Sequence, residues 1–123
     1  MESAATRPDI TANGAPVKEV SGMNLRGRVE IVIDMTDYVG PTPPKVDALS
    51  LIGVKKATVE LFDGKDVVKT VTSDGSEITF PESPRATRVV ISVEDENATA
   101  TLVLKACYKR RGKAHHVNEI SDQ

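Results

Sequence analysis

Residues 57–72 read ATVELFDGKDVVKTVT, and this stretch decides the fold class. Val59 and Leu61 recur at the two-residue period of a β-strand that buries one face. Asp63-Gly64 interrupts the pattern, and Asp-Gly supplies the positive φ angles that a type I′ hairpin turn requires. A second segment rich in Val and Thr follows the turn. The stretch therefore predicts an antiparallel β-hairpin.

Segments of the same character lie on both sides of this hairpin. They are bounded by Gly, Pro, Asp and Asn clusters, and none has the period of an amphipathic helix. Apolar residues on both faces of 45–54 fit a strand buried on both sides or a strand with a bulge near Ser50. The pattern predicts an all-β fold, an antiparallel β-sandwich or jelly roll of about seven to eight strands. The further strands are expected over 28–35, 45–54, 77–80, 87–93 and 98–107.

The 123 residues suffice for one domain. Residues 1–21 contain Pro, Gly, Ala and Thr without a stable apolar period, so they are expected to form a flexible N-terminal tail. The β-sandwich domain is assigned to 22–108. Residues 109–123 are basic and then polar, and they are expected to form a flexible C-terminal tail.

Composition bears on the classes of partner. The 16 basic and 18 acidic residues give a net charge of -2, which argues against nucleic acid as a partner. No apolar run approaches the ~18 residues that span a bilayer, so no membrane insertion is expected. Cys107 is the only cysteine. It is interpreted as a buried, inert thiol or as half of a disulfide with a cysteine elsewhere in a larger parent protein.

The sequence contains no catalytic constellation. Both histidines, His115 and His116, lie in the C-terminal tail, where packing cannot hold an imidazole beside a carboxylate, so the chain is not expected to be an enzyme. Asp34 with Asp37, and the acidic cluster at residues 94–96, offer oxygen donors that suit a hard cation such as calcium. Calcium needs about six oxygens from several loops, so no metal site and no cofactor are predicted.

The second half of the chain resembles the C-terminal half of a discoidin domain (coagulation factor 5/8 type C, galactose-binding-like). The resemblance implies a jelly roll with a closing strand that ends in cysteine. The chain is shorter than a typical member and has no cysteine upstream of Cys107, and an immunoglobulin-like or fibronectin-like sandwich is the alternative. The residues that carry the resemblance are VDALSLIGV at 46–54, ATVELFDG at 57–64, ITF at 78–80, ATRVVISV at 86–93 and LVLKAC at 102–107.

The candidate binding residues lie in loops. Tyr38 is an aromatic residue beside the Pro-rich segment 41–44, and with Asp37 it is the predicted recognition contact. Asn97 begins an N-glycosylation sequon, Asn97-Ala98-Thr99, at an expected hairpin tip. These features favour a non-catalytic binding or adhesion module of a larger extracellular or surface protein, which recognises a protein or glycan through inter-strand loops. The alternative is a structural or assembly module without a small-molecule ligand. The sequence leaves the ligand and the oligomeric state open.

Overall fold

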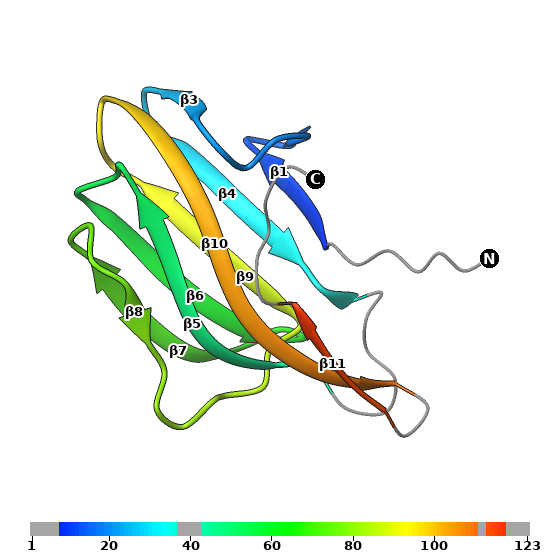
Figure 1. Ribbon diagram of the computed structural model, residues 1–123. Helices are drawn as coiled ribbons and strands as arrows, with labels where there is room; N and C mark the ends of the chain where they lie inside the picture. Colours follow the sequence, from blue (N-terminus) through cyan, green and yellow to red (C-terminus); the bar gives the residue numbers. More distant parts are fainter. Residues whose placement is uncertain (1–7, 37–42, 111–112, 118–123) are drawn as a thin grey trace.

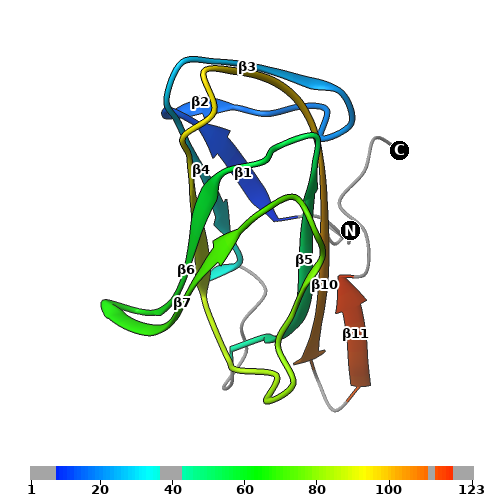
Figure 2. The ribbon, with the colours of Figure 1, turned by 90° about the vertical axis from the view of Figure 1, so that its left-hand side faces the viewer.

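A computed structural model describes residues 8–36, 43–110 and 113–117, with side chains described as far as Cys107. Two antiparallel sheets face each other, and the described residues contain no α-helix (Figures 1 and 2). The strands are β1 (Asp9–Ala12), β2 (Ala15–Pro16), β3 (Met23–Arg26), β4 (Val29–Asp34), β5 (Lys45–Ile52), β6 (Ala57–Asp63), β7 (Asp66–Ser73), β8 (Ile78–Thr79), β9 (Arg88–Val93), β10 (Asn97–Arg110) and β11 (Lys113–Val117).

The order of the strands is that of a jelly roll. One sheet runs β2-β1-β4-β9-β6-β7, and the other runs β11-β10-β5-β8 with β3 paired to the first part of β10. Strands β3 to β10 therefore form two four-stranded layers, β3-β10-β5-β8 and β4-β9-β6-β7. This is the paired Greek-key arrangement of eight strands in two sheets. The predicted fold class is confirmed, and β1, β2 and β11 extend the two layers.

The core lies between the sheets and is built from alternate residues of the central strands. Cross-strand neighbours Ile31, Ile91 and Val59 fill one inner face, and each is at most 1% exposed. The inner face of the other sheet is supplied by Leu49, Leu51, Leu102 and Leu104. Burying each of these side chains contributes about 1.5–3 kcal/mol, so the two inner faces hold the sandwich together.

The mixed apolar pattern of 45–54 has a specific cause. Ala48 lies opposite Lys105 but Val46 lies opposite Ala106, so Asp47 is an extra residue in β5. This bulge shifts the alternation by one residue and turns Val46 into the core with Leu49. The predicted bulge therefore exists at Asp47 and not near Ser50.

The N-terminal tail predicted over 1–21 is wrong for residues 9–20. Asn13-Gly14 connects β1 to β2 with φ angles of 50° and 86°, both positive as a type I′ turn requires. Asn13 also joins this hairpin to β4, because its Oδ1 accepts the amide of Glu30 at 2.8 Å. Ile10 and Val20 are 4% and 0% exposed and belong to the core. Residues 1–7 lie outside the described part of the chain.

The backbone at residues 109–110 and 113–117 differs from the flexible C-terminal tail expected from residue 109. β10 continues to Arg110 and pairs with β11, from Ala106 opposite Val117 to Arg110 opposite Lys113.

The hairpin formed by β6 and β7 differs from the sequence-based expectation in its turn type. Asp63 pairs with Asp66, so Gly64 is the first central residue, and positive φ occurs there (65°) and not at Lys65. This is the type II′ pattern.

Candidate functional site

The predicted recognition contacts, Asp37 and Tyr38, lie outside the described residues. Their role stays a prediction. The prolines that flank this loop are described only at Pro43 and Pro44, and Pro43 accepts a hydrogen bond through its carbonyl oxygen from Nη1 of Arg85 at 2.7 Å.

Asn97 is exposed and is the first residue of β10. It does not lie at a hairpin tip, because the turn before it carries the chain from β9 in one sheet to β10 in the other. It pairs with Arg26, and the hydroxyl of Thr99 donates to Oδ1 of Asn24 at 3.4 Å. These side chains line a shallow polar depression between β3 and β10. Glycosylation of Asn97 stays a prediction, tested by the mass change on N-glycosidase treatment of secreted protein.

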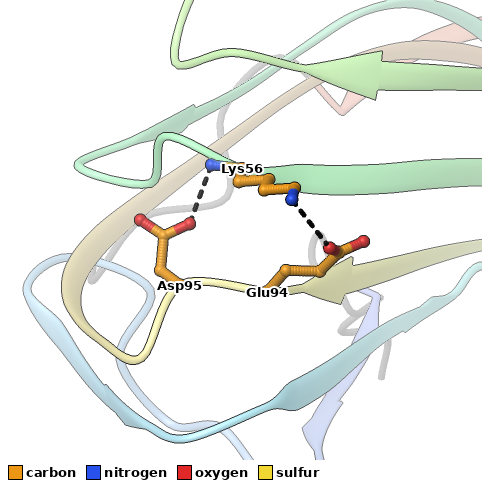
Figure 3. A network of polar contacts seen from close by, with 3 residues as sticks. All are labelled: Lys56, Glu94 and Asp95. Carbon is orange, nitrogen blue, oxygen red and sulfur yellow. Dashed lines mark hydrogen bonds and ion pairs between the residues drawn. The ribbon is translucent and has the colours of Figure 1, made fainter.

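Acidic residues in the turn between β9 and β10 connect it to the turn between β5 and β6 (Figure 3). The carboxylate of Asp95 accepts the backbone amides of Lys55 and Lys56, at 3.0 and 2.7 Å. The ammonium group of Lys56 lies 3.6 Å from the carboxylate of Glu94. Both carboxylate oxygens of Asp95 therefore bind the turn between β5 and β6, and this geometry gives Glu94 and Asp95 structural roles.

Replacing Asp95 by alanine is expected to lower the free energy of unfolding by about 1–2 kcal/mol, because two turn amides lose their acceptor. Glu94→Ala removes only an exposed ion pair and is expected to cost less than about 1 kcal/mol. Urea unfolding followed by circular dichroism measures both. Equal losses in the two variants would contradict the role assigned to Asp95.

Side chains that could hold a metal ion do not gather in the described residues. No three His, Cys, Asp or Glu side chains among them lie close enough to hold a metal ion. Cys107 is half-buried, carries a free thiol and lies opposite Lys45. Arg88 lies 4.6 Å over the ring of Phe62, and its Nε has no hydrogen-bond acceptor in the described part of the protein. No helix of the described chain is long and apolar enough to cross a membrane.

The most distinctive exposed feature is β7, which ends the six-stranded sheet and pairs only with β6. At eight residues it is the longest strand at a sheet edge in the described protein. Val67 and Val68 are 50% and 42% exposed. Val68 is the extra residue of a bulge, since Lys69 lies opposite Leu61 and Val67 opposite Phe62. Figure 2 shows the turn of the β6–β7 hairpin standing away from the second sheet.

Sequence reasoning identified β7 as a strand but not as a free edge. One signal was available, because adjacent Val67 and Val68 break the alternation that a half-buried strand requires.

Comparison with protein-family models, with curated proteins and with solved structures found no match. The discoidin resemblance therefore stays a prediction, and the jelly roll alone does not identify an activity.

Proposed function

We propose that this jelly roll is a non-catalytic interaction module that binds a protein partner by strand addition at β7. An edge strand offers a row of unpaired backbone N–H and C=O groups, and an extended segment of a partner can pair with them. The observation that carries the proposal is the eight-residue length of this edge together with the exposed Val67 and Val68.

The edge is adapted to selective binding. The bulge at Val68 and the charge of Lys69 hinder indiscriminate pairing at the turn end of β7. Residues 69–73 beyond the bulge stay in regular register with β6, from Lys69 opposite Leu61 to Ser73 opposite Ala57. A partner segment therefore finds a regular ladder of five residues next to an exposed apolar pair, and it should be extended and rich in β-branched residues.

The ring faces of the described aromatic residues are buried or covered, which favours a protein partner over a glycan. Phe80 is 2% exposed, and Phe62 is half-buried with the guanidinium of Arg88 over its ring. Neither offers the open aromatic face on which a sugar ring stacks. Recognition through backbone hydrogen bonds and small apolar side chains needs no such platform.

The same edge supports a second function, a structural or assembly module. If β7 pairs with β7 of another copy, two six-stranded sheets become one continuous sheet. The partner in this case is the chain itself, and its association depends on protein concentration.

The proposal is tested with a double variant, Val67→Lys and Val68→Lys. Both side chains are exposed, so the free energy of unfolding should change by less than about 1 kcal/mol. Peptides selected from a random displayed library on the native protein are expected to be rich in Val, Ile and Thr, and to bind the variant at least ~10-fold more weakly. A matched control, Lys55→Glu with Lys65→Glu, should keep full peptide binding.

Sedimentation of the native protein over a range of concentrations separates the two functions. A monomer that binds the selected peptides supports the recognition module, and association abolished by the double variant supports the assembly module. Peptides that bind the native protein and the double variant equally, with a monomer throughout, would exclude both. An extracellular or surface setting within a larger protein remains part of the proposal, and its motivating feature is the exposed sequon at Asn97.

A further inference from the structure

Arg88 places a guanidinium group on the outer face of the six-stranded sheet. In the sheet it lies opposite Phe62 of β6 on one side and Asp34 of β4 on the other. Leu61 and Val89, which adjoin Phe62 and Arg88 along the two strands, belong to the core. Strand alternation therefore turns Phe62 and Arg88 away from the core, toward the outer face.

This guanidinium is fixed in position but has no counter-ion. It lies 4.6 Å over the ring of Phe62, where cation–π attraction holds it. Nε of Arg88 is buried, and no group in the described part of the protein accepts its hydrogen. No ion pair between described residues involves Arg88. A planar guanidinium with unpaired donors beside an apolar ring suits a carboxylate, because the low local dielectric strengthens such a pair.

The acidic residues nearest to Arg88 in the sheet do not supply this carboxylate. Asp34 is exposed, and its Oδ1 accepts the backbone amide of Thr36 at 2.9 Å. Glu60 lies opposite Val90, two residues before Phe62 on β6 and on the same face. Neither carboxylate forms an ion pair with Arg88 in the described structure. The guanidinium is therefore available to an acidic group of a partner.

The free edge of the sheet lies close to this guanidinium. Val67 of β7 lies opposite Phe62, and it is 50% exposed. Because Arg88 extends over the ring of Phe62, Val67 is the one side chain in this row between the guanidinium and the edge. A glutamate on a strand added at β7 can extend over Val67, and its carboxylate then ends about one strand spacing, ~4.8 Å, from the guanidinium. Aspartate is one methylene shorter and would end farther away.

We propose that Arg88 selects partner segments that carry a glutamate at the end that lies beside Val67. This inference rests on the proposed strand addition at β7 and assigns a specificity-determining residue to it. The bulge at Val68 ends the regular ladder at Lys69. The glutamate therefore follows the residues that pair with 69–73, and its carboxylate accepts hydrogen bonds from the guanidinium of Arg88. The partner is an extended segment rich in β-branched residues with one terminal glutamate.

The test compares two peptides on three forms of the whole chain by fluorescence anisotropy at about 0.15 M salt. One peptide is selected from the random displayed library on the native protein, and the other has glutamine in place of its terminal glutamate. The glutamine peptide is expected to bind the native protein about 10-fold more weakly, because hydrogen bonds to a charged group are lost. Arg88→Gln should weaken the glutamate peptide about 10-fold and the glutamine peptide less than about two-fold.

The matched control is Arg28→Gln. It removes the same charge from an exposed residue that precedes β4, at the other end of the sheet from Arg88. It should weaken either peptide less than about two-fold, because salt screens charges at that distance. Arg88→Lys keeps the charge but loses the planar fork, and an intermediate loss of about three-fold is expected. If Arg88→Gln fails to fold by circular dichroism, Arg88→Lys and the peptide substitution still decide the question.

The outcomes separate this inference from the strand addition on which it rests. Equal binding of the two peptides to the native protein, or equal losses of both in Arg88→Gln, would overturn the role of Arg88. Strand addition would still stand if Val67→Lys with Val68→Lys abolished binding of those peptides. A glutamate preference that depends on Arg88 but not on Val67 and Val68 would overturn strand addition and keep the ion pair. A library that yields no binding peptide would overturn both.

Discussion

Replacing Ile10 and Val20 together by alanine is expected to lower the free energy of unfolding by about 4–6 kcal/mol. Both side chains lie in the core, at 4% and 0% exposure, and each truncation leaves a cavity in addition to the lost apolar burial. Val20 also accepts the amide of Leu102 through its backbone carbonyl, so the segment before β3 is fixed to β10. A domain of this size is stable by about 5–15 kcal/mol, so the loss is a large share of the total.

The matched control is Val67→Ala with Val68→Ala. These valines are about half exposed, and their truncation should change the free energy of unfolding by less than about 0.5 kcal/mol. Urea unfolding followed by circular dichroism measures both pairs. If the Ile10 and Val20 variant matched the native protein, residues 9–20 would be dispensable, and their assignment to the jelly roll would be wrong.

Gly53→Ala is expected to cost about 3–5 kcal/mol, which combines backbone strain with steric overlap. Gly53 follows β5 with φ of 100°, a conformation that residues with a side chain rarely adopt. A Cβ atom at this position would overlap the backbone carbonyl oxygen of Thr99 and would lie 3.1 Å from its carbonyl carbon. Because these are backbone atoms of β10, no side-chain rearrangement can relieve the contact.

Gly22→Ala measures the cost of backbone strain without the steric overlap. Gly22 also has positive φ, at 69°, but a Cβ atom there would meet nothing within 4 Å. Its substitution should therefore cost about 1 kcal/mol, from backbone strain alone. Thermal or urea unfolding of the two variants gives the difference. Similar losses at Gly53 and Gly22 would show that the close approach to Thr99 is not rigid.

The interior of the fold was predictable because its strands carry a local signal. Val59 and Leu61 alternate with half-buried residues, and one buried face of a strand requires that period. The end strands were harder to predict, because β1 and β2 are short and contain few apolar residues. Asn13-Gly14 is nevertheless a strong local hairpin signal, although Pro8 and Pro16 around it have the composition of a tail.

The candidate surfaces were less predictable, because they arise from long-range pairing. Whether β7 is an edge or a central strand depends on its place beyond β6, which its own residues indicate only through the adjacent Val67 and Val68. The run from Lys109 to Lys113 has the composition of a solvated tail, and the pairing of β10 with β11 is not encoded in that composition. Asn97 of the sequon is exposed, but the chain crosses between the two sheets from β9 to β10, and this crossover depends on long-range pairing.

Chemical-shift mapping with a selected peptide tests the central claim most directly, namely that recognition occurs at the free edge of the six-stranded sheet. Isotope-labelled protein is titrated with the tightest-binding peptide, and backbone amide resonances are followed. The shifts are predicted to concentrate in β7, from Asp66 to Ser73, with smaller effects in β6. Shifts confined to the loop end around Asn24, Arg26 and Asn97, with β7 unchanged, would contradict the account.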